Sequence, residues 1–269
     1  MSLKHFFRNT LLASIILLGC DNPFSYSPFE TTVDDRYRNT TTLNLERLGQ
    51  IDTLTNPVFK IALISDTHYH FDDTRDAINH INEKGEASFV IATGDITENG
   101  LKKEFEIFHN IMAHLHSPYL TVIGNHDYLA NGGDVYRQMF GAFNYTFTFQ
   151  GVRFIMFDNV IWESNKEADF QWLENAFSEA DETEPVRHTL IFSHIPPFDG
   201  QLKEKRELFH SMLMQNDVKV SVHGHKHEYF SGELMGDGVR YVTVGSPQKR
   251  SYALLTITED EITVEKVPF

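Results

Sequence analysis

Short apolar runs that lead directly into polar, ligand-type side chains recur along this sequence and constrain its fold more than any other feature. In one of them, Leu120, Val122 and Ile123 form a run typical of a buried strand, which Gly124 breaks. Five such runs deliver, in chain order, Asp66 and His68, then Asp95, then Asn125 and His126, then His194, and then His225 and His227. Folds that alternate strands and helices bind ligands at the carboxyl ends of parallel strands. We therefore expect these side chains to meet at one edge of the fold.

The spacing of the first three runs supports a parallel sheet. Asp66 and Asp95 are 29 positions apart, and Asp95 and Asn125 are 30 positions apart, which matches the roughly 30 residues of a strand–helix–strand unit. The polar side chains supply carboxylate, amide-oxygen and imidazole ligands in numbers sufficient for two metal ions. These ligands suit Mn, Fe or Zn better than Ca, which takes only oxygen.

Each of these residues also has a structural interpretation when it is taken alone. Asp66 and Asp95 could form turns at strand ends, Asn125 could cap a helix, and His194 could be a buried histidine with a hydrogen-bond partner. The metal interpretation is favoured because the residues occur together, at five strand ends. If the chain stays extended there, His225 and His227 would also point to the same side.

The remaining periodicity predicts an α/β fold. Apolar residues at helical spacing predict helices at residues 73–83, 101–115, 168–180 and 204–215. Strands are predicted at 58–64, 87–92, 119–123, 144–149, 152–157, 188–192, 218–222, 229–235, 239–244, 251–258 and 262–267. An α/β core closed by antiparallel strands indicates two packed sheets with helices outside. We expect residues 128–143 and 196–203 to form the walls of the pocket.

The polar residues after the five runs form a recognisable series of motifs. They are Asp66-x-His68, Gly94-Asp95, Gly124-Asn-His-Asp127, His194 and Gly224-His-x-His227. In this order they resemble the five motifs of the calcineurin-like metallophosphoesterase family, and the similarity covers about residues 58–260. The resemblance implies that family's fold, a four-layer αββα sandwich of two mixed β-sheets flanked by helices.

The resemblance also implies how metal ions are held. One ion would be bound by Asp66, His68, Asp95 and His227, and the other by Asp95, Asn125, His194 and His225. Asp95 would bridge the two ions, because a carboxylate can give one oxygen to each. Two ions roughly 3.5–4 Å apart lower the pKa of a shared water. The resulting bridging hydroxide would attack phosphorus.

Four further residues near the ligands receive expected roles. His126 is not a ligand in the family pattern and would assist the leaving oxygen as an acid or charge stabiliser. We expect Asp127 to hold the other ring nitrogen of His126, and His223 and Tyr69 to line the pocket. Glu98 stands where purple acid phosphatases carry the tyrosine that ligates ferric iron, so we expect no purple Fe(III) centre.

The first residues are typical of an export signal. Lys4 and Arg8 precede an apolar stretch at residues 11–18, which is too short to span a bilayer. This stretch ends at Cys20, the only cysteine, in a pattern that resembles the lipobox of bacterial lipoproteins. We therefore expect residues 1–19 to be a signal peptide and Cys20 to carry lipid. The alternatives to a lipoprotein signal are an ordinary secretory peptide and an uncleaved N-terminal anchor.

The expected domain organisation follows from this N-terminus. Residues 20–57 are predicted to be a tether or N-terminal extension, and residues 58–269 one catalytic domain. The protein would be an exported, membrane-anchored lipoprotein of a bacterial cell envelope, with its catalytic domain outside the cytoplasm. The formal net charge of −15 repels phosphate backbones. We therefore expect a small phosphoester as substrate and no nucleic acid as partner.

The most favoured function is metal-dependent hydrolysis of phosphoesters, with diesters preferred. The motifs most resemble the family branch that contains cyclic-nucleotide and glycerophosphodiester phosphodiesterases. One alternative is a pyrophosphatase or phosphomonoesterase acting on nucleotide-sugar or lipid-linked substrates. Another is a non-catalytic, metal-binding surface lipoprotein.

Overall fold

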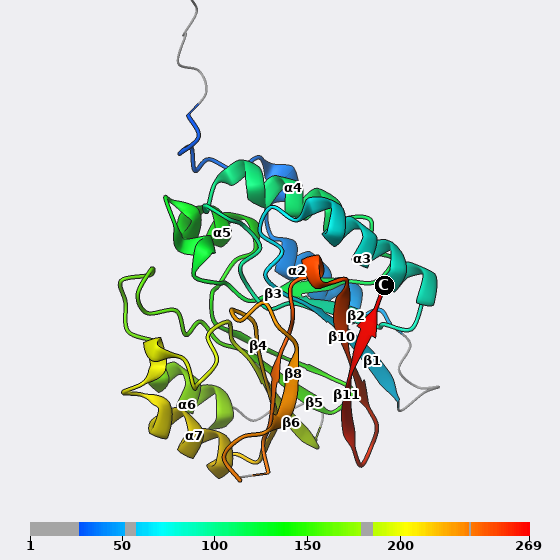
Figure 1. The fold of residues 1–269 in the computed structure, drawn as a ribbon, viewed down its shortest axis with the longest axis vertical. Coiled ribbons are helices and arrows are strands. Elements are labelled where there is room, and N and C mark those ends of the chain that lie inside the picture. The colour runs from blue at the N-terminus through cyan, green and yellow to red at the C-terminus, as the bar shows by residue number, and fades with distance from the viewer. Residues whose placement is uncertain (1–26, 52–57, 179–184, 237) are drawn as a thin grey trace, which may run out of the picture.

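Two mixed β-sheets lie face to face in the computed structural model, which describes residues 27–51, 58–178, 185–236 and 238–269 (Figure 1). The strands are β1 (Phe59–Ile64), β2 (Phe89–Ala92), β3 (Tyr119–Thr121), β4 (Tyr145–Phe149), β5 (Val152–Met156), β6 (His188–Phe192), β7 (Val218–His223), β8 (Phe230–Glu233), β9 (Arg240–Thr243), β10 (Ser251–Ile257) and β11 (Ile262–Pro268). The first sheet has the order β11-β10-β1-β2-β3, and the second has the order β4-β5-β6-β7-β9-β8.

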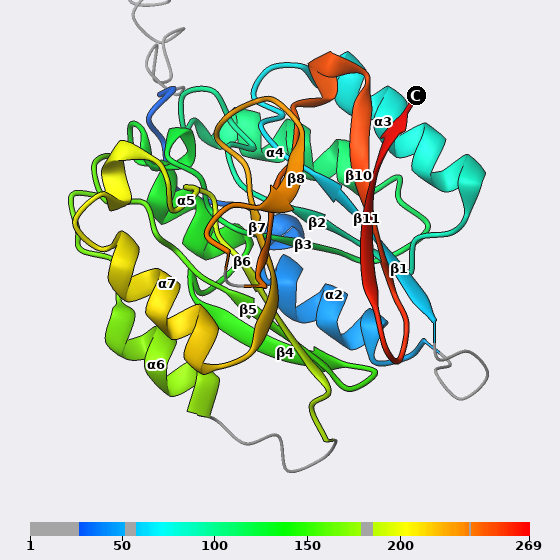
Figure 2. The same cartoon turned by 60° about the horizontal axis from the view of Figure 1, so that its bottom comes forward.

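Helices cover the outer faces of both sheets (Figure 2). These helices are α3 (Phe71–Lys84), α4 (Lys102–Met112), α5 (Gly132–Met139), α6 (Phe170–Ser178) and α7 (Arg206–Gln215), whereas α2 (Thr40–Leu48) lies at the edge of the first sheet. Side chains of α3, α4 and α5 pack on the first sheet, and those of α6 and α7 pack on the second. A third core fills the space between the sheets. The expected four-layer αββα sandwich is therefore confirmed.

The strands that lead to the polar residues are apolar on both faces because both faces are covered. In β1, Ile61 and Leu63 pack between the sheets, whereas Ala62 and Ile64 pack against the helices. Successive side chains of a strand point to opposite faces, so a strand buried on both sides needs a continuous apolar run. β1, β2 and β3 pair in parallel, as expected from their spacing.

Helix α5 was not among the expected helices. It lies within residues 128–143, which we expect from the sequence to be a pocket wall. Val135, Tyr136 and Met139 are buried in the core between the first sheet and its helices, and the Tyr136 hydroxyl lies 2.8 Å from the Thr121 hydroxyl. Other residues of the segment, among them Arg137 and Phe143, line a pocket as expected. The helix begins at two glycines, Gly132 and Gly133, whose low helix propensity conceals it in the sequence.

The described part of the expected tether, residues 27–51, packs on the domain. Val33 and Tyr37 join the core under α4 and α5, and Leu48 joins the core between the sheets. Residues 27–51 therefore form a packed N-terminal extension of the domain rather than a free tether, because their widely spaced apolar side chains find partners that are distant in sequence. Phe29, in the same segment, is exposed.

The expected signal peptide and the lipid attachment site at Cys20 lie outside the described residues, as do Phe24 and Tyr26. Both remain predictions. Within the parts of the chain that the structure describes, no helix has the length and apolar character needed to cross a membrane.

Helix α2 covers the free edge of the first sheet, where β3 is the last strand. The Asn44 side-chain oxygen accepts a hydrogen bond from the backbone N–H of Tyr119 (3.2 Å), and its amide nitrogen donates to the Thr40 carbonyl (3.0 Å). Asn44 is buried. Exposed strand edges carry unpaired backbone groups that recruit other chains. The helix thus satisfies a backbone donor that the sheet itself leaves open.

Replacing Asn44 with alanine would leave the N–H of Tyr119 buried without this acceptor. We expect Asn44→Ala to lower the free energy of unfolding by about 1–3 kcal/mol, as measured by urea denaturation. Leu43 is 53% exposed on the same helix, so Leu43→Ala should change stability by less than about 0.5 kcal/mol. Equal losses in the two variants would contradict the role assigned to Asn44.

Candidate metal centre and active site

Loops at the carboxyl ends of strands from both sheets bring the expected site residues together. Asp66 and His68 follow β1, Asp95 follows β2, Asn125 lies beyond β3, His194 follows β6, and His225 and His227 follow β7. They group into two clusters of ligand atoms that share Asp95. The sandwich architecture explains why these residues lie together, because strands from both sheets end beside the same site.

The first cluster contains Asp66, His68, Asp95 and His227, whose ligand atoms all lie within 4.8 Å of one another. The Nε2 atoms of His68 and His227 are 3.3 Å apart. The Nε2 of His227 lies 3.5 Å from Asp66 Oδ1, and the Nε2 of His68 lies 3.8 Å from Asp95 Oδ2. These four residues are the ones that the family resemblance implies for one metal ion.

The second cluster contains Asp95, His194 and His225, and Asn125 completes it. The Nε2 of His194 is 3.1 Å from Asp95 Oδ2 and 3.1 Å from Asn125 Oδ1. The Nδ1 of His225 is 2.9 Å from the same Asn125 oxygen. The other nitrogen of His194 is bonded to the Thr93 carbonyl (2.8 Å), which directs Nε2 into the cluster.

The chemistry of the donor atoms fits bound metal. Burial raises the pKa of Asp66 to about 7, and the neighbouring Asp95 adds to the rise against the effect of His194. Burial also lowers the pKa of His68 to about 4 and that of His225 to about 4. Neutral imidazoles keep a lone pair for a metal, and a cation offsets the cost of burying carboxylates close together.

Five of the ligand residues have a left-handed backbone. The φ angles are 51° for Asp66, 43° for His68, 50° for Asp95, 71° for His225 and 56° for His227. This region is unfavourable for residues other than glycine, and such residues concentrate at functional sites. It also corrects the expectation for His225 and His227. They do not continue β7 as an extended chain, and each belongs to a different cluster.

Glycines in the motifs allow the ligand loops to touch. A Cβ atom on Gly124 would lie 2.1 Å from the backbone nitrogen of Asp95, and one on Gly94 would lie 2.5 Å from Nδ1 of His194. Both distances are far below van der Waals contact. Glycine is therefore required beside these ligands for steric reasons.

His126 stands beside the first cluster with one ring nitrogen fixed. Its Nδ1 lies 2.7 Å from the backbone carbonyl of Glu98, and its backbone N–H donates to Asp95 Oδ1 (2.8 Å). Its ring meets the ring of His68 edge to face at 4.6 Å. Because a carbonyl only accepts, Nδ1 carries a proton and Nε2 is the nitrogen that titrates. Burial lowers the pKa of His126, but Asp95 and the Glu98 carbonyl outweigh it and raise the pKa overall.

Asp127 does not orient His126, so that expectation is wrong. Its carboxylate accepts hydrogen bonds from the N–H of Thr97 (2.9 Å), the hydroxyl of Thr97 (2.8 Å), the N–H of Gly124 (2.9 Å) and the N–H of Ile96 (3.3 Å). The side chain is fully buried. Its role is to fasten the loop after β2 to the turn after β3, because four donors surround it there.

His223 differs from its expected role in lining the pocket. It is completely buried, with Nδ1 3.1 Å from the Ser193 hydroxyl and Nε2 2.8 Å from the Ser221 hydroxyl. It therefore connects β7 to the residue that follows β6 from inside the fold. Tyr69 is 59% exposed next to His68, and its expected role stays a prediction.

Three carboxylates that the sequence analysis did not predict as site residues hold the outer sides of ligands. The pairs are Glu98 Oε2 with His68 Nδ1 (3.0 Å), Glu163 Oε1 with Asn125 Nδ2 (3.2 Å), and Asp199 Oδ2 with His225 Nε2 (3.5 Å). The Glu98 contact is an ion-pair approach whose angle falls short of a hydrogen bond. Such contacts orient a ligand and increase its basicity. Glu98 stands out in the sequence only as the residue that replaces tyrosine. Glu163 and Asp199 belong to no motif and could not be found from sequence.

The motif residues lie in a stretch that matches a known family. Residues 59–229, more than half of the chain, match the calcineurin-like phosphoesterase family. This chain belongs to that family. The two clusters that share Asp95 could hold two metal ions, and the resemblance expected from the motifs is confirmed.

Several proteins are similar to this calcineurin-like phosphoesterase in sequence. A probable cyclic nucleotide phosphodiesterase of Rhodopseudomonas palustris is 27% identical over 166 residues, which cover 54% of this chain and 60% of the relative. A probable glycerophosphodiester phosphodiesterase of Arcobacter nitrofigilis is 36% identical over 84 residues, which cover 26% of this chain and 31% of the relative. The similarity thus spans about three fifths of the first relative and less than a third of the other.

Solved structures share the fold. A dimetal phosphatase from Danio rerio superimposes with a TM-score of 0.63 at 16% identity, over 79% of this chain and 97% of that chain. A purple acid phosphatase from yellow lupin seeds gives a TM-score of 0.64 at 14% identity, over 78% of this chain and 51% of that chain. These likenesses support the two-sheet sandwich described above.

The contact between Glu98 and His68 predicts an effect on metal binding. We expect Glu98→Ala to weaken Mn(II) binding by about 10–100-fold, because the His68 ring loses the group that orients it. Calorimetric titration of the metal-free protein measures this. Glu98→Gln retains a carbonyl acceptor, so this variant should keep most of the Mn(II) affinity. Glu83 is exposed, and Glu83→Ala should bind Mn(II) as tightly as the unsubstituted protein. An unchanged affinity in Glu98→Ala would refute the assignment.

Proposed function

We propose that this calcineurin-like phosphoesterase hydrolyses phosphoester bonds with two metal ions and prefers phosphodiesters. The proposal rests on one observation, the buried Asp95 carboxylate that is shared by two clusters of ligand atoms and also accepts the N–H of His126. Metal ions bound in these clusters supply a strongly nucleophilic water at neutral pH and offset negative charge on the phosphoryl group.

His126 would protonate the leaving oxygen. The Glu98 carbonyl occupies Nδ1, which leaves Nε2 as the atom that donates. Its pKa is raised overall, with Asp95 outweighing burial, and this favours the charged, proton-carrying form. A positioned acid of this kind contributes about 10²–10⁴-fold to a reaction whose leaving group must be protonated.

The preference for diesters is supported by charge. Glu98, Glu163 and Asp199 surround the metal ligands, and the formal net charge of the chain is −15. Near neutral pH a phosphomonoester carries more negative charge than a diester, since its second pKa is about 6. An acidic surrounding therefore disfavours the monoester. The names of the two relatives, both phosphodiesterases, support the same preference.

The same negative charge supports a small substrate rather than a nucleic acid, whose backbone would be repelled.

For location, we propose an exported lipoprotein of a bacterial envelope, anchored through Cys20 with the domain outside the cytoplasm. Lys4, Arg8 and the apolar residues 11–18 support this. Cys20→Ser should move the protein from the membrane fraction to the soluble fraction of fractionated cells. Undiminished membrane association would contradict a lipid anchor at this residue.

Hydrolysis by the purified protein tests the catalytic proposal. After removal of metal and reloading with Mn(II), kcat/KM for bis(p-nitrophenyl) phosphate should exceed that for p-nitrophenyl phosphate. We expect Asp95→Asn to lower kcat for bis(p-nitrophenyl) phosphate by about 10²–10⁴-fold, since it removes the shared ligand charge. His126→Ala should cause a loss of that size for a dialkyl phosphate, whose leaving oxygen must be protonated, and a much smaller loss for the p-nitrophenyl ester. The exposed residues Asp72 and His114 supply matched controls, and Asp72→Asn and His114→Ala should retain full activity.

The other outcomes separate the alternatives. A preference for the monoester, with the same dependence on Asp95, would keep the metal mechanism and favour the phosphomonoesterase or pyrophosphatase alternative. Metal binding without turnover of any phosphoester would favour a non-catalytic surface lipoprotein. Activity that survives Asp95→Asn unchanged would refute the proposed mechanism.

A further inference from the structure

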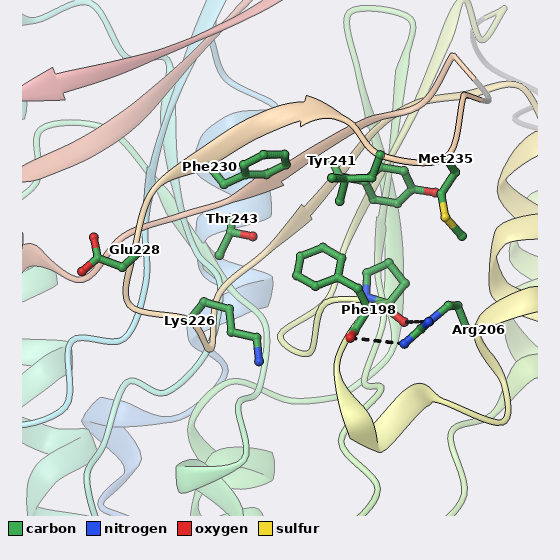
Figure 3. Close-up of a pocket in the computed structure, with 10 residues that line it drawn as sticks. Phe198, Arg206, Lys226, Glu228, Phe230, Met235, Tyr241 and Thr243 are labelled. Atoms are coloured by element: carbon green, nitrogen blue, oxygen red, sulfur yellow. Dashed lines mark hydrogen bonds between the residues drawn. The ribbon is translucent and has the colours of Figure 1, made fainter.

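A cavity of about 490 Å³ opens beside the metal ligands, between the loop after β6 and the β8–β9 hairpin (Figure 3). Its walls are mainly apolar and include Phe198, Phe230, Leu234, Met235 and Tyr241. Figure 3 shows Phe198 and Phe230 on different chain segments around the same hollow. The volume lies within the range of pockets that bind small organic ligands.

Apolar side chains that normally avoid water are exposed at this cavity. Phe198, Phe230, Leu234 and Met235 are each between 38% and 45% exposed. A single exposed apolar residue needs no explanation, but a group of them around one hollow marks a binding surface. A ligand that covers them would be stabilised by removal of this area from water.

The charged side chains of the cavity already have partners. The Lys226 ammonium group bonds to the Asp199 carboxylate, and Glu228 pairs with Lys249. The Arg206 guanidinium donates to the backbone carbonyls of residues 197 and 198 at 2.8 Å and 3.2 Å. These contacts hold the walls together. The charges of Lys226 and Glu228 are balanced by their partners, whereas Arg206 is bonded to neutral carbonyls and keeps its positive charge.

The cavity lies close to the metal centre. Lys226, which lines the cavity, stands in the chain between His225 and His227, one ligand of each cluster. The Asp199 carboxylate oxygen that bonds Lys226 also lies 3.5 Å from the His225 ring. Lys226, paired with Asp199, therefore forms the part of the cavity wall that faces the metal ligands.

We propose that this cavity binds an uncharged, apolar organic group of the phosphoester, so that the substrate is an ester of an apolar alcohol. The inference rests on the proposed function and adds the class of substrate. The exposed apolar walls, the ion pairs of Lys226 and Glu228, and the closeness of the cavity to the metal ligands lead to it together. The charged phosphoryl group belongs at the metal centre, and the apolar substituent belongs between Phe198 and Phe230.

Binding of n-alkylphosphonates to the full-length, Mn(II)-loaded protein tests this without requiring turnover. Calorimetry should show that affinity increases from methyl- to butyl- to octylphosphonate, by about two- to fourfold per added methylene while the chain fills the cavity. Phe230→Ala and Leu234→Ser should flatten this dependence. Leu208, on α7, is 45% exposed outside the cavity. Leu208→Ala should therefore leave the dependence of affinity on chain length unchanged.

Phenylphosphonate compared with cyclohexylphosphonate shows which apolar group fits best. Tighter binding of phenylphosphonate assigns an aromatic substituent to the cavity, and tighter binding of cyclohexylphosphonate assigns a saturated one. Either result supports the proposal. Equal affinity for all chain lengths, or an equal dependence on length in Phe230→Ala and Leu208→Ala, would overturn it. The Mn(II) stoichiometry of each variant confirms that it is folded.

Hydrolysis of p-nitrophenyl alkyl phosphates separates this proposal from the proposed function. If no ester is hydrolysed but phosphonate affinity depends on chain length and on Phe230, the cavity assignment stands and the hydrolase proposal fails. If metal-dependent hydrolysis occurs while both kcat/KM and affinity are independent of chain length, the hydrolase stands and the cavity assignment fails.

Discussion

The rest of the site depends on one buried carboxylate, that of Asp95. Although burial alone would raise the pKa of Asp95, it is lowered to about 2 because His194 lies beside it. Its charge in turn contributes to raising the pKa values of Asp66 and Asp127 to about 7, after the larger effect of burial. Asp95 also accepts the backbone N–H of His126. The geometry of both clusters and the state of the proposed acid therefore follow from its position.

The sandwich fold makes that position possible. Asp95 follows β2 of the first sheet, while His194 and His225 follow β6 and β7 of the second. Neither sheet carries both clusters, so the packing of Leu63, Ile91 and Phe192 between them sets the distances among the ligands. The left-handed backbone at Asp66, Asp95 and His225 is unfavourable locally, and it persists because the closely packed loops allow no alternative path.

The strands and the site residues that follow them can be predicted from the sequence, because they depend on residues that are close together in the chain. Asp66 and His194 follow recognisable apolar strands, so their arrival at one edge followed from the topology of an α/β fold. Asp127 was assigned wrongly because the direction of a buried carboxylate depends on donors such as Thr97, which lies 30 positions earlier. Contacts such as Glu163 with Asn125 and Asn44 with Tyr119 join distant segments and have no local pattern.

The loop that carries His225, Lys226 and His227 contributes both to the ligand clusters and to the wall of the cavity. Its two histidines belong to different clusters, and the lysine between them forms part of the cavity wall. Neighbouring residues share a backbone, so a substituent of the proposed substrate that displaced Lys226 would also move both imidazoles. Substrate size and metal retention would then be mechanically coupled, and selection for a larger substrate would act on the stability of the metal centre as well.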